Sequence, residues 1–428
     1  MLLRFAVTNH RSILDSAELS MIAVDSDRLA TRGFDRLSER VLTVAGIYGP
    51  NASGKSNVLD AIAWLSRAVR TSLKQWEDFI PREPHRFGNG ASQPSTFNIE
   101  FMAGDLRYDY SLEVDDEKVI YESLHSYPER RRRLLFERDL DEIDFRRGTR
   151  GQIAIRELLS PTTLALSAAL RYRDPNLLAA GQTISKIGTQ GLRVRPRFGR
   201  PVGGWVANSL AHSGVVTERF FDTGRHSGQE SLFGSDDVYT SRSEAALALL
   251  KFADLGIDGV EIVEDDDSEA RTRRRRVQLI HRSSGGPVAF ELHDESAGTR
   301  TWFRLIGPAL AALDTGQLLI FDEIDASLHP RLSARLLELF QDPATNPNGA
   351  QLVFTTHDTS LLGWLNRDEV WLTEKDDNGA TTITALADFG GSRVRKSLNL
   401  EKAYLQGRFG GVPELDQMVL KNALGLVN

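Results

Sequence analysis

The stretch from Val44 to Ile62, VAGIYGPNASGKSNVLDAI, constrains the fold more than any other part of the chain. An apolar run becomes a loop with two glycines and then apolar residues at helical spacing, which predicts strand, loop and helix. The loop fits GxxxxGK[ST], in which backbone N–H groups surround phosphates, a lysine reaches the β- and γ-phosphates and a hydroxyl binds Mg²⁺. We therefore expect ATP here, facing the helix N-terminus. The expected contacts are Gly49, Asn51, Ser53, Gly54, Lys55, Ser56 and Asn57, with Ser56 also a Mg²⁺ ligand.

Length and composition indicate an ordinary globular chain. Its 428 residues, 41% of them hydrophobic, are enough for two or three domains or lobes. The absence of cysteine excludes disulfides, thiolate nucleophiles and cysteine-based zinc sites, and agrees with a cytoplasmic location. The segment Met1–His10 is too polar for a signal peptide, and no apolar run has the length of a membrane span. We therefore expect a cytoplasmic protein without a membrane partner.

The net charge of −7 gives no general attraction to nucleic acid. Any contact with DNA or RNA must use local basic clusters, and such clusters more often lie on a solvated face. Acidic residues at Glu264–Asp267 partly cancel the last of these clusters. The candidates are Arg130–Arg133, the alternating Arg193, Arg195, Arg197 and Arg200, and Arg273–Arg276.

Hydrophobic patterning divides the chain into three parts. Residues 1–147 predict an ATPase lobe, in which period-two alternation indicates strands and a β meander. Residues 148–242 lack a strong period and predict a mostly helical insertion with loops. In residues 243–428 strands alternate with helices, which predicts an α/β layer with a parallel core. The strands expected in the first part are Leu2–Val7, Ala17–Val24 in the same sheet, Val41–Tyr48, and the meander of Thr96–Tyr127 continued by Arg133–Phe145.

Helices and loops follow from the same patterns. The helix after Ser56 is expected to end near Leu73. Glycine and serine gather in Thr223–Ser235, which predicts a loop. Helical stretches are expected within Ile153–Tyr172 and Trp205–His212, and helices at Ser243–Leu255, Gly298–Leu313 and Pro330–Phe340. Further expected strands are Val260–Val263 and Val277–His281 around an acidic and arginine-rich turn, Gln317–Phe321, Gln351–Thr355 and a hairpin after Asp368.

Two apolar strands of the last part end in polar residues. LLIFDE, Leu318–Glu323, delivers two carboxylates at the end of a strand, the edge where α/β sheets bind ligands. Asp322 is expected to hold Mg²⁺ and Glu323 to act as general base on the attacking water. TTHD follows the next strand and places His357 at the same edge, where it can bond the γ-phosphate. Alone, each stretch also fits a buried strand with a polar end.

A second anion-binding helix start lies at DESAGTRTWFRL, with Ser296 and Gly298 before the helix. One nucleotide has no need of two such sites. We therefore expect this helix start to meet the γ-phosphate of a partner subunit, so that a homodimer or higher homo-oligomer holds two ATPs. A simple capped helix is the alternative.

These stretches carry a family resemblance. GPNASGKS, ESAGT, LLIFDE and TTH resemble, in order, the Walker A, signature, Walker B and switch-histidine elements of ABC-type ATPases. The start RFAVTNHRSILDSAELS resembles that of the Rad50, SMC, RecF and OLD branch, which implies that Arg11 and Ser12 lie near the nucleotide. FNIEF, LRYDYSLEV, RRRLLFERD, DEIDASLHP and EKAYLQGRFGGVP are similar to bacterial OLD-like, RloA-type ATPases associated with phage defence.

The resemblance implies an α/β, ABC-type P-loop ATPase head with an antiparallel β meander and a helical insertion. There are departures: Ala52 replaces a loop glycine, and His329 stands where an aspartate is common. OLD nucleases also carry a Toprim domain, but the roughly 70 residues after His357 are short of the about 100 expected of a domain. We therefore expect any nuclease activity to come from a partner chain.

The leading hypothesis is an ATP-hydrolysing switch that controls a separate effector, a nuclease in antiphage defence. A DNA-repair clamp of the RecF or Rad50 type would use the arginine clusters on phosphates, with steep salt dependence. A nucleotide-binding sensor with little turnover is a third reading, and a transporter ATPase fits the N-terminal strands poorly.

Overall fold

The computed structural model describes residues 1–146, 151–172, 174–192, 217–222, 235–267, 272–326, 328–389 and 399–410. Several predicted features lie outside these residues. They are the helical stretch Trp205–His212, the alternating arginines 193–200 and nearly all of the Thr223–Ser235 loop.

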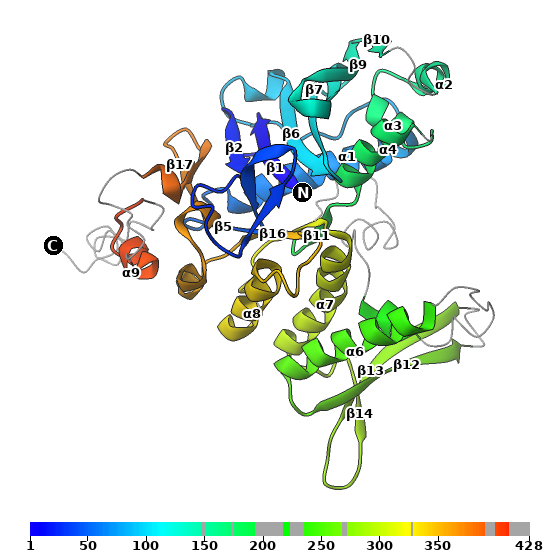
Figure 1. Cartoon of the computed structure of the whole chain (residues 1–428), viewed down its shortest axis with the longest axis vertical. Coiled ribbons are helices and arrows are strands. Elements are labelled where there is room, and N and C mark those ends of the chain that lie inside the picture. Colours follow the sequence, from blue (N-terminus) through cyan, green and yellow to red (C-terminus); the bar gives the residue numbers. More distant parts are fainter. Residues whose placement is uncertain are drawn as a thin grey trace, which may run out of the picture.

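The centre of the molecule is a six-stranded sheet in the order β11-β15-β16-β5-β17-β18 (Figure 1). All its neighbours pair in parallel except β17 and β18, which form the expected hairpin. Because β15, β16 and β5 are adjacent and parallel, their carboxyl ends meet at one edge. The strands are β5 (Val44–Tyr48), β11 (Gly188–Gln190), β15 (Leu318–Phe321), β16 (Gln351–Thr355), β17 (Val370–Lys375) and β18 (Thr381–Ala385).

A seven-stranded antiparallel sheet lies above it in the order β10-β9-β8-β7-β6-β1-β2 (Figure 1). The predicted meander and the pairing of the first two strands are confirmed. One prediction is wrong: Val41–Tyr48 is not a single strand, because Thr43 separates β5 from β4, which pairs with β3. The bounds are β1 (Leu2–Thr8), β2 (Ala17–Ser20), β3 (Thr31–Phe34), β4 (Leu37–Leu42), β6 (Ser95–Ala103), β7 (Leu106–Val114), β8 (Val119–Ser126), β9 (Arg133–Asp139) and β10 (Glu142–Phe145).

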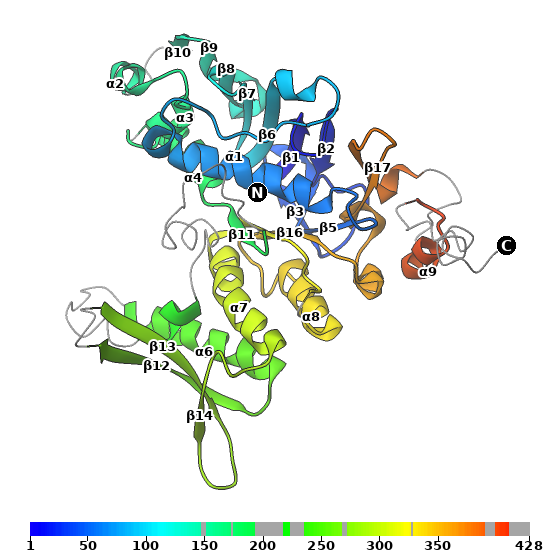
Figure 2. The ribbon, with the colours of Figure 1, turned by 180° about the vertical axis from the view of Figure 1, so that it is seen from behind.

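Helix α1 (Lys55–Gln75) lies between the two sheets (Figure 2). Its apolar residues share one buried core with the antiparallel sheet and with one face of the central sheet, through Ala45, Ile320 and Val353. Helices α2 (Gln152–Leu158), α3 (Ala165–Ala169) and α4 (Pro175–Ser185) contribute to that core. The stretch predicted as a helical insertion thus carries helices, and it also supplies β11 to the central sheet.

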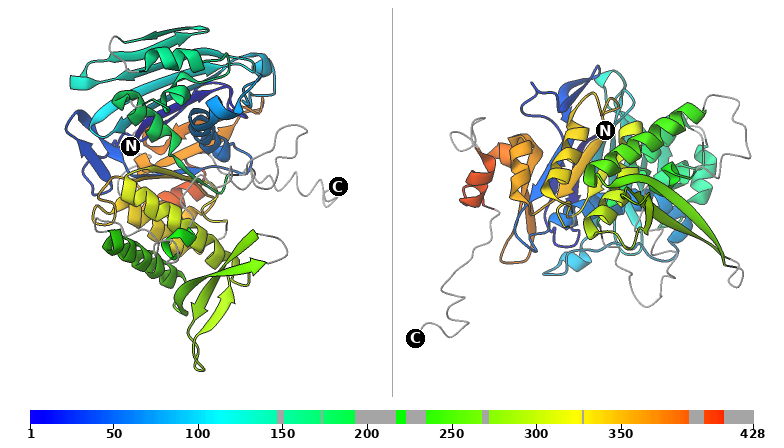
Figure 3. Two further views of the ribbon diagram at one scale, coloured as in Figure 1. Left: turned by 90° about the vertical axis from the view of Figure 1, so that its right-hand side faces the viewer. Right: turned by 90° about the horizontal axis from the view of Figure 1, so that it is seen from below.

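The other face of the central sheet packs on a second core through Val44, Leu319 and Phe354. This core contains α6 (Ser235–Ala253), α7 (Ala297–Thr315), α8 (Pro330–Gln341) and α9 (Leu400–Leu405). Beside it projects a three-stranded sheet of β12 (Ile257–Asp267), β13 (Thr272–His281) and β14 (Val288–Glu291), seen at the bottom of Figure 3, left.

The acidic and arginine-rich turn expected between two short strands is instead paired strand. The backbone of Glu264, Asp265 and Asp266 pairs in register with Arg275, Arg274 and Arg273. Polar composition suggested a turn, but antiparallel strands with solvated faces accept charged residues of opposite sign directly opposite each other.

A buried glutamine joins the two large sheets. Gln351, at the start of β16, accepts a hydrogen bond from the backbone N–H of Leu2 and donates to the carbonyls of Leu2 and Leu42, both at 2.9 Å. Short 3-10 helices complete the description at Gly90–Ser92, Pro128–Arg130, Thr217–Phe220, Thr359–Trp364, Arg367–Glu369 and Leu386–Asp388. No helix in the described ranges is long and apolar enough to cross a membrane.

Candidate nucleotide site

The loop between β5 and α1 has a shape that only glycine permits at two positions. Gly49 has φ 152° and Gly54 has φ 102°. An added Cβ would lie 2.5 Å from the carbonyl oxygen of Thr373 at the first and 2.1 Å from Thr381 Oγ1 at the second. Ala52 adopts the left-handed region at φ 63°, which for alanine costs about 1–2 kcal/mol.

The N-terminus of α1 is open toward this loop. Its capping residue, Gly54, supplies no side-chain hydrogen bond, so the first N–H groups of the helix have no side-chain cap. By contrast, Asp174 caps α4 and Ser296 caps α7. An uncapped helix start that follows a tight glycine loop is a ready anion site.

Lys55 is folded back over the loop. Its Nζ donates to the carbonyl oxygens of Gly49 at 2.8 Å and Pro50 at 3.1 Å. Burial lowers the pKa of Lys55 to about 8, and the nearby carboxylates of Asp322, Asp325 and Glu323 oppose that shift.

The predicted carboxylates follow β15 directly. Asp322 is buried, and its Oδ1 accepts a hydrogen bond from Thr355 Oγ1 at 2.6 Å. The same hydroxyl accepts from the N–H of Glu323 at 2.8 Å. Glu323 is exposed and has φ 55°, an unfavourable backbone conformation for glutamate that commonly marks functional sites. One threonine therefore orients the turn that carries both acids.

His357 lies beside these groups. Burial and the positive charge of Lys55 lower its pKa, against the opposing effect of the carboxylates, so the ring is neutral at pH 7. The backbone N–H of His357 donates to the carboxylate of Asp325 at 3.2 Å, and the hydroxyl of Thr356 donates to the same carboxylate at 2.7 Å. Asp325 was not predicted from the sequence, although its place two residues after Glu323 is a signal that could have found it.

A chain of hydroxyl groups from the C-terminal hairpin supports the loop. Thr373 donates to the carbonyl of Tyr48 and therefore accepts from Ser53 Oγ at 2.7 Å. Thr381 donates to the Ser53 carbonyl at 2.8 Å and accepts from Ser12 Oγ at 2.7 Å. The two threonines were missed, because the spacing along the sequence gives no sign that residues more than 300 positions apart meet.

The two N-terminal candidates have different surroundings. Ser12 lies against the loop, where Asn57 donates to its hydroxyl at 2.5 Å. Arg11 instead forms ion pairs with Asp60 at 2.9 Å and Glu83 at 3.2 Å. Ser12 is therefore placed at the phosphate loop, whereas Arg11 is held by the second turn of α1 and by the loop after that helix.

Ser296 and Gly298 lie at the start of α7. Ser296 Oγ accepts from the N–H of Thr299 at 3.0 Å. Within the described part of the chain, no hydrogen bond or ion pair joins them to the phosphate loop or to Asp322, Glu323 and His357. The unusual His329 caps α8, since its Nδ1 accepts from the N–H of Arg331 at 3.2 Å.

The donor set fits Mg²⁺. The hydroxyl of Ser56 and the carboxylate of Asp322 are the oxygen ligands this ion prefers, and it usually keeps several waters and contacts phosphate. Asp322, Asp325 and Glu323 face Lys55 closely enough to affect its pKa, so the site carries an excess of negative charge. The ion would supply positive charge at the phosphates.

Comparison with known proteins assigns the chain to a family. Residues 44–363 match the model of a family described as "AAA domain, putative AbiEii toxin, Type IV TA system". The chain belongs to this family. The phosphate loop, both acids and His357 of this AAA domain lie inside the matched range. No curated protein sequence matches the chain.

Solved structures with remote similarity to the chain include heads of SMC proteins. An SMC head bound to the C-terminal winged-helix domain of ScpA is 13% identical, with a TM-score of 0.44 and 90% of this chain and 97% of that chain covered. The SMC head domain from Thermotoga maritima is 14% identical, with a TM-score of 0.40 and coverage of 90% and 98%. An SMC head with coiled coil and joint from Pyrococcus yayanosii is 11% identical, with a TM-score of 0.41 and 95% of this chain and 98% of that chain covered.

Proposed function

We propose that the chain is a Mg²⁺-dependent ATPase whose copies close in pairs around two ATPs, and that this movement controls a separate effector chain. The observation that carries the proposal is that Lys55, Asp322, Glu323 and His357 lie close together. The charges of the two acids affect the pKa of Lys55, and the charges of all three residues affect the pKa of His357. This arrangement brings a phosphate-binding cation, two acids and a neutral imidazole to the uncapped start of α1.

Each group has a role that its surroundings favour. Lys55 leaves the loop carbonyls and binds the β- and γ-phosphates, and Ser56 and Asp322 hold Mg²⁺. Glu323, exposed on a strained turn, takes the proton of the attacking water. The neutral His357 donates a hydrogen bond to the γ-phosphate and loses it when phosphate leaves.

The dimer is proposed from the distribution of anion sites. Ser296 and Gly298 form a second helix start that, among described contacts, is not connected to the first. A second copy that presents its α7 to this copy's phosphate loop gives that helix start a ligand. Each ATP then lies between two chains, so turnover requires pairing.

The effector is proposed from the sequence resemblance to OLD-like, RloA-type ATPases and from the family description, which names a toxin–antitoxin system. We propose a nuclease chain in trans that acts in antiphage defence. Co-purification of that chain with the ATPase, and loss of phage protection with Lys55→Met, would support this step. Protection by Lys55→Met equal to that of the wild type would contradict it.

Glu323→Gln tests the catalytic part. We expect at least about a hundredfold loss of ATP turnover, because the general base is gone, with ATP binding retained. Mass measured by light scattering should show an ATP-dependent dimer that persists. Glu338→Gln on the exposed face of α8, where Glu338 pairs with Arg335, is the matched control. Unchanged turnover in Glu323→Gln would remove the assigned base, and negligible wild-type turnover with tight ATP binding would favour a sensor.

A nucleic-acid-stimulated ATPase is the second candidate, because Arg130–Arg133 are exposed at the start of β9. In the other described cluster, the backbone of Arg273–Arg275 pairs in register with the acidic stretch Glu264–Asp266 of β12. Stimulation by DNA at low salt that falls steeply as salt rises would favour this candidate. If DNA did not stimulate ATP turnover, the effector switch would remain the favoured function.

A further inference from the structure

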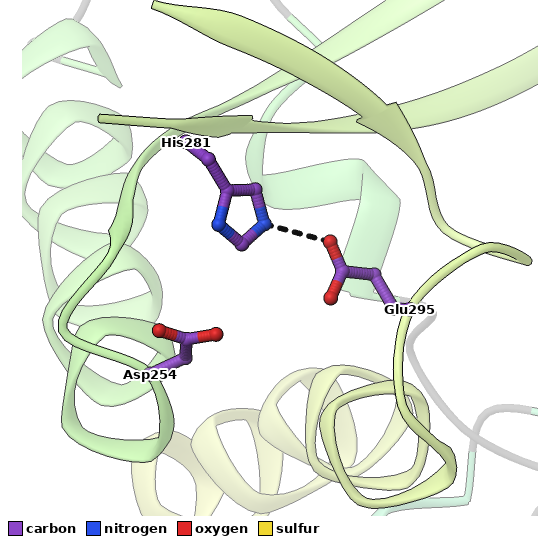
Figure 4. Close-up of side chains that lie close together, drawn as sticks. All are labelled: Asp254, His281 and Glu295. Carbon is purple, nitrogen blue, oxygen red and sulfur yellow. Dashed lines mark hydrogen bonds and ion pairs between the residues drawn. The ribbon is translucent and has the colours of Figure 1, made fainter. Parts of the chain in front are cut away.

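Three potential metal ligands meet at a point that the nucleotide site does not use. Asp254 follows α6, His281 ends β13 and Glu295 precedes α7, and Figure 4 shows their side chains around a shared space. One ligand atom from each residue lies within 4.8 Å of the other two. We propose that Asp254, His281 and Glu295 form a binding site for a divalent transition-metal ion such as Zn²⁺.

The charge of the cluster favours a cation. His281 Nε2 and Glu295 Oε1 are 2.7 Å apart, and the Glu295 side chain is only 9% exposed. Asp254 is half-buried and accepts a hydrogen bond from the N–H of Gly256 at 2.8 Å. Two carboxylates held this close repel each other unless a positive charge lies between them.

Basic side chains of the neighbouring elements are engaged elsewhere. Lys251 and Arg282 both pair with Asp258, and Arg300 donates to the carbonyls of His293 and Glu295. Among the described ion pairs, none joins a lysine or an arginine to the carboxylate of Asp254 or Glu295. An external cation would supply the compensating charge.

The space and the donor types fit such an ion. A Cβ at Gly256 would lie 3.1 Å from Asp254 Oδ1 and 3.5 Å from His281 Nδ1, so glycine keeps that side of the cluster open. An ion held at about 2.1 Å by each ligand needs ligand atoms roughly 3.3–3.5 Å apart, which small side-chain rotations provide. Imidazole nitrogen selects zinc and similar ions over Mg²⁺. Water would complete the coordination of such an ion, because all three residues are partly exposed.

A bound ion would fix the start of α7. Glu295 is the residue before Ser296, the cap of that helix. The ion therefore ties this segment to β13 and to the end of α6, and holds Ser296 in one orientation toward a partner. This regulatory consequence rests on the proposed function; metal binding itself does not.

Zn²⁺ binding is measured by equilibrium dialysis with metal analysis, in excess Mg²⁺ and without nucleotide. We expect one equivalent in the wild type and in the control His293→Ala, whose ring is exposed in the same segment. Asp254→Asn, Glu295→Gln and His281→Ala should each weaken the affinity at least about tenfold. Co²⁺ should give the absorption of a four-coordinate nitrogen-containing site, lost in His281→Ala.

Equal binding in all variants would place the ion elsewhere and overturn the site, as would the absence of binding in the wild type. Should His281→Ala fail to fold, the near-isosteric Asp254→Asn and Glu295→Gln decide the outcome. ATP turnover is measured separately on zinc-loaded and zinc-free protein. Zinc binding with unchanged turnover keeps the site and rejects its effect on α7, whereas absent turnover with normal zinc binding rejects only the ATPase.

Discussion

Lys55 keeps its charge in surroundings that oppose it. Burial brings its pKa from 10.5 to about 8, and its Nζ donates hydrogen bonds to two carbonyl oxygens of the phosphate loop. Because the folded pKa lies below the unfolded one, the charged lysine destabilises the fold fully below about pH 8. That cost disappears as the pH rises from about 8 toward 10.5. Lys55 is therefore primed to gain a stronger anionic partner.

We predict that nucleotide binding at pH 8 takes up a fraction of a proton, because bound phosphates raise the pKa of a half-protonated Lys55. At pH 6.5 the lysine is already charged, so its contribution should be small. Calorimetry in buffers of different ionisation enthalpy measures the uptake. Lys55→Met, which should be at least as stable as the wild type at pH 7 without nucleotide, supplies the baseline for any residual binding.

His357→Ala is the control for the proton count. Its imidazole is neutral at pH 8, since its pKa is lowered, so the variant should keep the uptake seen at that pH. If binding at pH 8 took up no proton in the wild type, the assignment of the low lysine pKa would be contradicted.

At the scale of elements, the β17–β18 hairpin acts as the support of the phosphate loop. Thr373 bonds to the hydroxyl of Ser53 and Thr381 bonds to its carbonyl oxygen. Thr381 Oγ1 also occupies the space that a side chain at Gly54 would need. The hairpin is thus part of the nucleotide site although it carries no recognised motif.

Thr381→Val should weaken this support. The change keeps the volume but leaves the Ser53 carbonyl and the Ser12 hydroxyl without their partner, which costs about 1–3 kcal/mol. We expect a lower midpoint in denaturant and weaker ATP binding. Thr382→Val, exposed on the same strand, is the matched control and should change neither. Equal losses in both variants would assign the effect to the strand instead.

Much of the candidate site could be predicted because its residues lie in short, continuous sequence motifs. The phosphate loop, the two acids and His357 each follow an apolar strand, and the parallel order of β15, β16 and β5 brings them together. The meander was predictable because its strands are neighbours in sequence and alternate clearly.

The remainder depends on contacts between distant segments. Strand β11 has three residues, too few for a pattern, and it exists only because β15 lies beside it. The break at Thr43 was missed because threonine is common inside strands. The cluster of Asp254, His281 and Glu295 brings together three elements, and the spacing of these residues along the chain did not predict it.

At the scale of the whole molecule, each ATP site is proposed to need two chains. The phosphate loop with its acids lies at the edge of the central sheet, whereas Ser296 caps a helix in the second core. A chain with one half damaged should then be rescued by a chain with the other half damaged.

We predict that Lys55→Met and Ser296→Arg are each inactive as ATPases and regain partial turnover when mixed. The arginine blocks the face offered to the partner and also removes the cap of α7, but it leaves the phosphate loop of its own chain unchanged. The mixed dimer therefore keeps one intact site. Turnover is measured at constant total protein against the mixing ratio, and Thr301→Arg serves as a control for an added charge on α7. No recovery at any ratio, with dimers present, would show that the two halves do not belong to one shared site.

Gln351 gives the two large sheets a continuous connection. Its side chain bonds to Leu2 on β1 and to Leu42 on β4, while its backbone belongs to β16, the strand that ends two residues before His357. If the proposed loss of the γ-phosphate shifts β16, that shift would reach the first residues of the antiparallel sheet through Gln351. That sheet would then act as a lever arm, and a protein seated on its outer strands could sense ATP turnover without touching the nucleotide.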